Sequence, residues 1–168
     1  MSHTYLLEPG LWTGTGTFWR EDGEALPAEW RTEVTHQSKC WLLAGTLRVL
    51  GSPPVEFRNV YSIEPPAKQG ACLRWISQNA ELGKIQGTFS VLGCCILSIY
   101  QSEGSGYHGA EHYGRIDPEH YQAAGVLLLG ARQLSSWEIL LTRAAARAGA
   151  PSADSDRAAG LQTATSDN

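Results

Sequence analysis

The sequence contains no long hydrophobic run and no cluster of basic residues. Its most apolar stretch, Val126 to Leu129, is far shorter than the ~18 consecutive apolar residues that a membrane-spanning helix needs. Thirteen Lys and Arg residues stand against 17 Asp and Glu, for a formal net charge of −4 at pH 7. A nucleic-acid-binding protein needs a face that neutralises phosphates. We therefore expect no membrane-spanning segment and no nucleic-acid partner.

Several signatures of catalysis and metal binding are also missing. The cysteines show neither Cys-x-x-Cys spacing nor a histidine at zinc-finger distance, so we predict no metal and no cofactor. The chain has no glycine-rich phosphate loop before a helix and no Gly-x-Ser-x-Gly motif. Each cysteine lies in an apolar, strand-like run, which predicts buried reduced thiols. The four are Cys40, Cys72, Cys94 and Cys95.

The N-terminus has no cationic start, and its apolar stretch is limited to Tyr5-Leu6-Leu7. A secretion signal needs a longer hydrophobic region. We therefore expect a cytoplasmic protein.

Large rings and glycine are abundant, with six Trp, six Tyr and 18 Gly, and this favours a turn-rich β protein. Short segments with alternating or continuous apolar character are separated by turn signals such as Asp22-Gly23. One helical alternative covers residues 136–148, where an apolar run continues into an Ala/Arg stretch. The predicted strands are residues 11–21, 29–37, 40–50, 55–64, 72–78, 83–91, 94–102, 107–116, 120–129 and 134–142.

Strands in hairpin order without a long helix are best arranged as an antiparallel up-and-down β-barrel, because closure removes exposed sheet edges. We predict an all-β fold with a single barrel over residues 1–143. A barrel of about eight to ten strands has room for one small molecule. Residues 144–168 have almost no large apolar side chains, so we expect a disordered tail.

The opening segment Gly10-Leu11-Trp12-Thr13-Gly14-Thr15-Gly16 resembles the first-strand motif of the calycin group. That group includes lipocalins, fatty-acid-binding proteins and nitrobindin-type barrels. The resemblance implies an antiparallel, calycin-like barrel. In nitrobindin-type proteins a histidine near the last strands ligates haem, but residues 133–143 contain no histidine, so this ligand does not carry over. Trp12 could close one end of the barrel, while the glycines would permit strong coiling of a first strand that pairs on both sides.

Residues 107–115 form the most suggestive segment for chemistry. On a strand, one face would carry Tyr107, Glu111, Tyr113 and Arg115, and the other His108 and His112. The sequence does not decide which face points inward. Burial would raise the pKa of Glu111 and make it a usable acid or base, which makes Glu111, His112 and Tyr113 candidate catalytic residues.

Two other arrangements of this segment remain open. In the first, the face with His108 and His112 points into the barrel, but the two histidines would lie about 13 Å apart along the strand, too far to share one metal. Alternatively, Glu111 and Arg115 would belong to a solvated outer face while the histidines pack against small neighbours.

An arginine and several aromatic residues are candidates for holding a ligand. Arg74 lies between Leu73 and Trp75 and could bind a carboxylate inside the barrel, as in fatty-acid-binding proteins, or else lie on the outer face. Aromatic side chains could line a cavity or simply fill the core, and Trp75 and Trp137 belong to this set. The predicted ligand-binding residues are Trp30, Trp41, Phe57, Tyr61, Arg74, Phe89, Tyr107 and Arg115.

Three functions from different classes fit these features. The first is intracellular binding of a small hydrophobic organic molecule inside the barrel. The second is an enzyme, such as a cyclase, isomerase or dehydratase, that uses cavity acid–base groups. The third is an interaction scaffold, in which an apolar outer patch binds a partner or a second copy in a homodimer.

Overall fold

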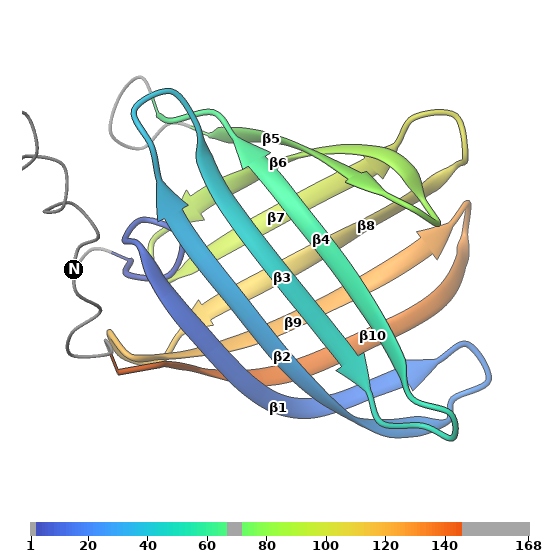
Figure 1. The fold of residues 1–168 in the computed structure, drawn as a ribbon. Coiled ribbons are helices and arrows are strands. Elements are labelled where there is room, and N and C mark those ends of the chain that lie inside the picture. Colours follow the sequence, from blue (N-terminus) through green and yellow to red (C-terminus); the bar gives the residue numbers. More distant parts are fainter. Residues whose placement is uncertain (1–2, 67–71, 146–168) are drawn as a thin grey trace, which may run out of the picture.

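The computed structural model describes residues 3–66 and 72–145, and over these ranges the chain is all-β. Each strand runs antiparallel to its neighbours, and β1 pairs with β10, so the barrel is closed (Figure 1). The strands are β1 (Gly10–Arg20), β2 (Ala25–His36), β3 (Trp41–Val49), β4 (Val55–Ile63), β5 (Leu73–Asn79), β6 (Gly83–Leu92), β7 (Cys95–Ser102), β8 (Tyr107–Arg115), β9 (His120–Leu129) and β10 (Arg132–Arg143). The predicted all-β, up-and-down antiparallel barrel is confirmed.

The observed strands differ from the predicted ones mainly at their ends. β2 begins at Ala25 rather than at residue 29, although Pro27 lies within it. Pairing with β3 begins only at Ala28, so Pro27 removes no donor from that ladder. β10 continues to Arg143, and the helical alternative is therefore wrong over the described part of residues 136–148. From residue 146 onward, the predicted tail lies outside the described residues.

A short N-terminal segment closes the end of the barrel at which β1 begins (Figure 1). Tyr5 and Leu6 are completely buried. The Tyr5 ring stacks on Tyr113 at a centroid distance of 4.7 Å and meets Trp12 edge-on at 5.4 Å. The Tyr121 hydroxyl accepts a hydrogen bond of 3.0 Å from the Thr4 backbone N–H. Trp12 thus lies buried at a closed end, as expected, but the segment that covers it was not predicted.

The cysteines are free thiols, but none of them is fully buried. Cys72 and Cys94 are exposed, and Cys40 and Cys95 are only partly buried, which corrects the expectation of buried thiols. Cys72 precedes the first residue of β5, and Cys94 lies in the turn between β6 and β7, so both lie just outside the strands. Over residues 3–66 and 72–145, no helix is long and apolar enough to cross a membrane.

Candidate functional site: a cavity around Glu111

The barrel interior holds a cavity, which lies beyond the N-terminal segment that closes one end of the barrel. The centre of a water molecule can move through about 120 Å³ of this cavity, so the cavity is much larger than a site for one water. The wall is mainly apolar or aromatic, with Phe18, Trp30, Leu43, Leu47, Phe57, Trp75, Leu82, Ile85, Leu127 and Trp137. Its polar members are Thr32, Asn59, Tyr61, Asn79, Glu81, Tyr100, Glu111, Tyr113 and Ser135. The cavity has room for a small organic molecule.

Glycines on neighbouring strands explain why the rings leave this space free. A Cβ atom on Gly87 of β6 would lie 2.5 Å from Cζ2 of Trp75. A Cβ on Gly125 of β9 would likewise overlap the indole of Trp137. Each indole ring therefore lies directly against the backbone of the neighbouring strand, in space that the side chain of any residue larger than glycine would occupy. The glycines let the rings line the barrel without filling it.

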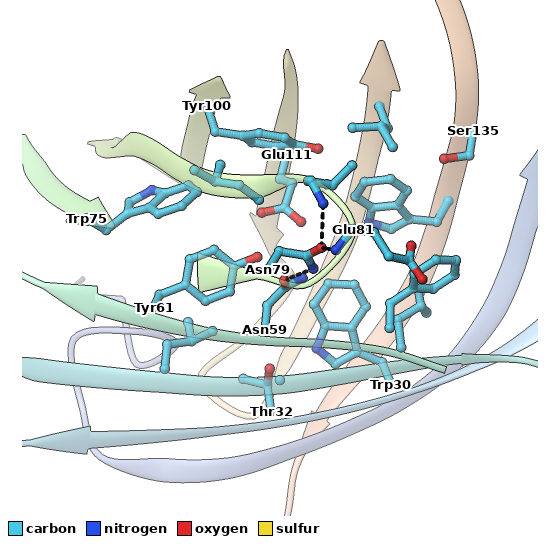
Figure 2. A pocket seen from close by; sticks show the side chains of 18 of the residues that line it. Trp30, Thr32, Asn59, Tyr61, Trp75, Asn79, Glu81, Tyr100, Glu111 and Ser135 are labelled. Atoms are coloured by element: carbon cyan, nitrogen blue, oxygen red, sulfur yellow. Dashed lines mark hydrogen bonds between the residues drawn. The ribbon is translucent and has the colours of Figure 1, made fainter. Parts of the chain in front are cut away.

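Glu111 is the buried acid of this cavity. Glu111 is 6% exposed, and its carboxyl group points into the cavity (Figure 2). The Tyr113 hydroxyl donates a hydrogen bond of 2.9 Å to Oε2. Burial raises the pKa of Glu111 to about 7, although the hydrogen bond from Tyr113 acts in the opposite direction. The carboxyl group therefore exchanges its proton near neutral pH.

Four tyrosines surround this carboxyl group. They come from different parts of the chain, and each has a pKa raised by burial and, secondarily, by the negative charge of Glu111. Their hydroxyls therefore stay protonated and neutral in the physiological range. The four are Tyr5 of the N-terminal segment, Tyr61 of β4, Tyr100 of β7 and Tyr113 of β8.

The turn between β5 and β6 lies at the end of the barrel opposite the N-terminal segment and contributes Asn79, Glu81 and Leu82 to the cavity lining (Figure 1). We call this end the mouth of the cavity. Asn79 accepts hydrogen bonds from the backbone N–H groups of Glu81 and Leu82, at 2.8 and 2.9 Å (Figure 2). Its side-chain amide donates to Oδ1 of Asn59 at 2.8 Å. β4 and β5 pair over only three residues each, Tyr61–Ile63 with Trp75–Ser77. The contact between Asn59 and Asn79 therefore bridges the two strands beyond the end of their ladder.

The structure brings five of the predicted site residues to the cavity: Trp30, Phe57, Tyr61, Glu111 and Tyr113. The face of β8 that carries Glu111 and Tyr113 points inward, which resolves the alternative that the sequence left open. Glu111 consequently does not belong to a solvated outer face.

His112 and Arg74 lie on the outside of the barrel. His112 is exposed between the buried Glu111 and Tyr113. Arg74 is exposed between the buried Leu73 and Trp75, so the interior position considered for it is not found. Both positions follow from the alternation of a strand with one buried face.

The remaining predicted residues lie in the barrel but do not line this cavity. Phe89 is a buried core residue, 5.8 Å from Trp75 between ring centroids. Trp41 stacks on His36 at 3.7 Å. Tyr107 and Arg115 are partly buried at the two ends of β8. Phe89 and Trp41 thus follow the alternative in which aromatic residues pack the core.

Sequence reasoning missed most of the polar wall. Tyr100 lies in a continuously apolar segment that gave no alternation to orient it, and Asn79 stands where the sequence indicated a polar turn. Thr32 alternates with charged residues on β2 and could have been found from that pattern. In the described part of the chain, no group of three or more His, Cys, Asp or Glu residues could hold a metal ion.

Comparisons with protein-family models, curated proteins and solved structures found no match. The closed antiparallel barrel is consistent with the calycin-like architecture that the first-strand motif implied. The geometry of the cavity is therefore the basis for proposing a function.

Proposed function

We propose that this barrel binds a small, largely apolar organic molecule in the cavity around Glu111. The observation that carries the proposal is an aromatic-lined interior space that reaches a buried carboxyl group. Three buried polar atoms of the wall, Nε1 of Trp30, Nε1 of Trp75 and Oγ1 of Thr32, have no hydrogen-bond partner among the described residues. Buried polar atoms are normally paired, so the preferred guest has polar groups as well as an apolar body.

A matched pair of variants tests binding in this cavity. Leu127 lines it, whereas Leu140, on the adjoining strand β10, is exposed on the outer face. We expect the neutral fluorophore 1-N-phenylnaphthylamine to bind the wild-type protein with ~1:1 stoichiometry. Leu127→Trp should weaken this binding by filling the cavity, and Leu140→Trp should leave it unchanged. Fluorescence titration that shows no saturation, or equal effects of the two variants, contradicts the proposal.

Acid–base catalysis is a second proposal, and the pKa of Glu111 near 7 favours it. A group with this pKa can accept and return a proton near neutral pH. Glu111 would act as the acid or base, and Tyr113, which donates to it, would position the carboxyl group. His112 has no part in this proposal, because it lies on the outer face.

Native mass spectrometry of protein from its own cells distinguishes catalysis from binding. We expect Glu111→Gln to retain an unconverted substrate that differs from the molecule held by the wild type, in mass for a dehydration and in chromatographic retention of the released molecule for an isomerisation or cyclisation. The same retained molecule in both proteins argues for binding without conversion.

A further inference from the structure

The ionisable groups that line the cavity are acids and phenols. Glu111 lies inside and Glu81 lies at the mouth, and no Lys, Arg or His of the described chain is part of the lining. A ligand with a carboxylate would place a second negative charge near Glu111 without a compensating cation. The electrostatics of the cavity therefore disfavour the carboxylate ligand that an interior Arg74 would have bound.

Aromatic rings flank the Glu111 carboxyl group (Figure 2). Tyr61 and Trp75 meet edge-to-face at a centroid distance of 4.6 Å, and Tyr100 lies 6.1 Å from Trp75. Ring faces attract organic cations through their quadrupole, most strongly where water is excluded. A carboxylate among such rings is suited to an ammonium group.

One carboxylate oxygen of Glu111 is available for this contact. Tyr113 donates to Oε2, whereas Oε1 accepts no hydrogen bond from the described residues. An ammonium group that donates to Oε1 would form a charge-assisted hydrogen bond in a site of low dielectric.

We propose that the ligand is an organic amine, with an apolar body against the aromatic wall and a protonated nitrogen that donates to Glu111. The inference rests on the proposed binding function and narrows it to one ligand class. The groups that face Glu111 are Tyr113 from its own strand, Tyr61 from β4, Tyr100 from β7 and Tyr5 from the N-terminal segment. These phenols stay neutral, so Glu111 supplies the charge.

Three ligands of similar size and different charge test the proposal. They are 2-phenylethylamine, 2-phenylethanol and phenylacetate, titrated calorimetrically at about pH 8, where Glu111 is mostly ionised. We expect the amine to bind about tenfold more tightly than the alcohol, and phenylacetate to bind most weakly. At about pH 6 protonation of Glu111 should reduce the advantage of the amine.

Two variants identify the residue responsible. Glu111→Gln should lose the preference for the amine and still bind 2-phenylethanol, which also shows that the variant is folded. Glu33→Gln removes an exposed carboxylate on the outer face of β2 and should keep the preference. If the amine and alcohol bind equally, or the preference survives in Glu111→Gln, the amine proposal fails while the binding function stands. If none of the three ligands and no neutral fluorophore binds, both proposals fail.

Discussion

Glu111 is an acid that folding moves from water into an apolar interior. Its pKa rises from an ordinary value of 4.5 to about 7 in the folded protein. The folded state therefore binds the proton of Glu111 more tightly than the unfolded state, so protonation of Glu111 stabilises the fold. This stabilisation is complete below about pH 4.5 and is lost as the pH rises through about 7.

We expect Glu111→Gln to remove this pH dependence, because an amide does not titrate. Between about pH 4.5 and pH 8, the stability of the wild type relative to the variant should fall by up to ~3 kcal/mol. Urea unfolding of both proteins across this range measures the difference. Glu33→Gln is the control, because that carboxylate is exposed. Parallel stability curves for the wild type and Glu111→Gln would show that Glu111 titrates normally.

The sequence identified Glu111 as a candidate but could not orient it. The two faces of β8 are similarly mixed, with Tyr, Glu and Arg on one and His, Ala and Gly on the other. Alternation then fixes which residues share a face and leaves its direction to the packing with the other strands. Arg74 shows the opposite case, since the apolar Leu73 and Trp75 on either side already favoured an outer position. The analogy with an interior arginine was weaker than this local pattern.

At the scale of elements, the turn after β5 depends on one side chain. The Asn79 side chain accepts hydrogen bonds from the backbone of Glu81 and Leu82 and donates one to the side chain of Asn59 on β4. Because the ladder between β4 and β5 is short, few other contacts hold this side of the mouth.

We expect Asn79→Ala to destabilise the protein by about 1–3 kcal/mol, because two turn N–H groups lose their acceptor and Oδ1 of Asn59 loses its donor. The mouth should also open more often, so bound 1-N-phenylnaphthylamine should dissociate faster. Stopped-flow fluorescence and hydrogen exchange at residues 80–82 measure these effects. Asn59→Ala removes only the contact between the strands, so the turn amides should stay protected. Equal protection of the turn in both variants would contradict the role of Asn79.

The elements themselves were largely predictable, because period-2 alternation and turn residues mark each hairpin. The N-terminal closure was not. Residues 3–9 show no strand pattern, and Tyr5 is buried through contacts with Tyr113 and Tyr121, more than a hundred positions away, as well as with Trp12. Contacts of this kind leave no local signal in the sequence.

At the scale of the whole molecule, closure depends on the seam between β1 and β10. The two strands pair from Trp12 with Arg143 to Arg20 with Ser135. Gly14 and Gly16 lie in this seam, and a Cβ on either would overlap a backbone carbonyl of β10, that of Leu140 or Glu138. These glycines therefore permit the close approach of the β1 and β10 backbones, whereas the expected strong coiling of the first strand stays a prediction.

We expect Gly16→Ala to weaken the seam, because neither backbone can move without breaking ladder hydrogen bonds. The cost should be about 1–3 kcal/mol or more, in the range of overpacked sites. Thr17→Ala is the matched control, since Thr17 follows on the same strand and pairs with Glu138. Urea unfolding gives the loss of stability, and hydrogen exchange locates it. If the seam is the weakened element, amides of β1 and β10 should lose protection before those of β6 and β7, which lie across the barrel. A uniform loss of protection, or a Gly16→Ala protein as stable as Thr17→Ala, would show that closure does not require glycine there.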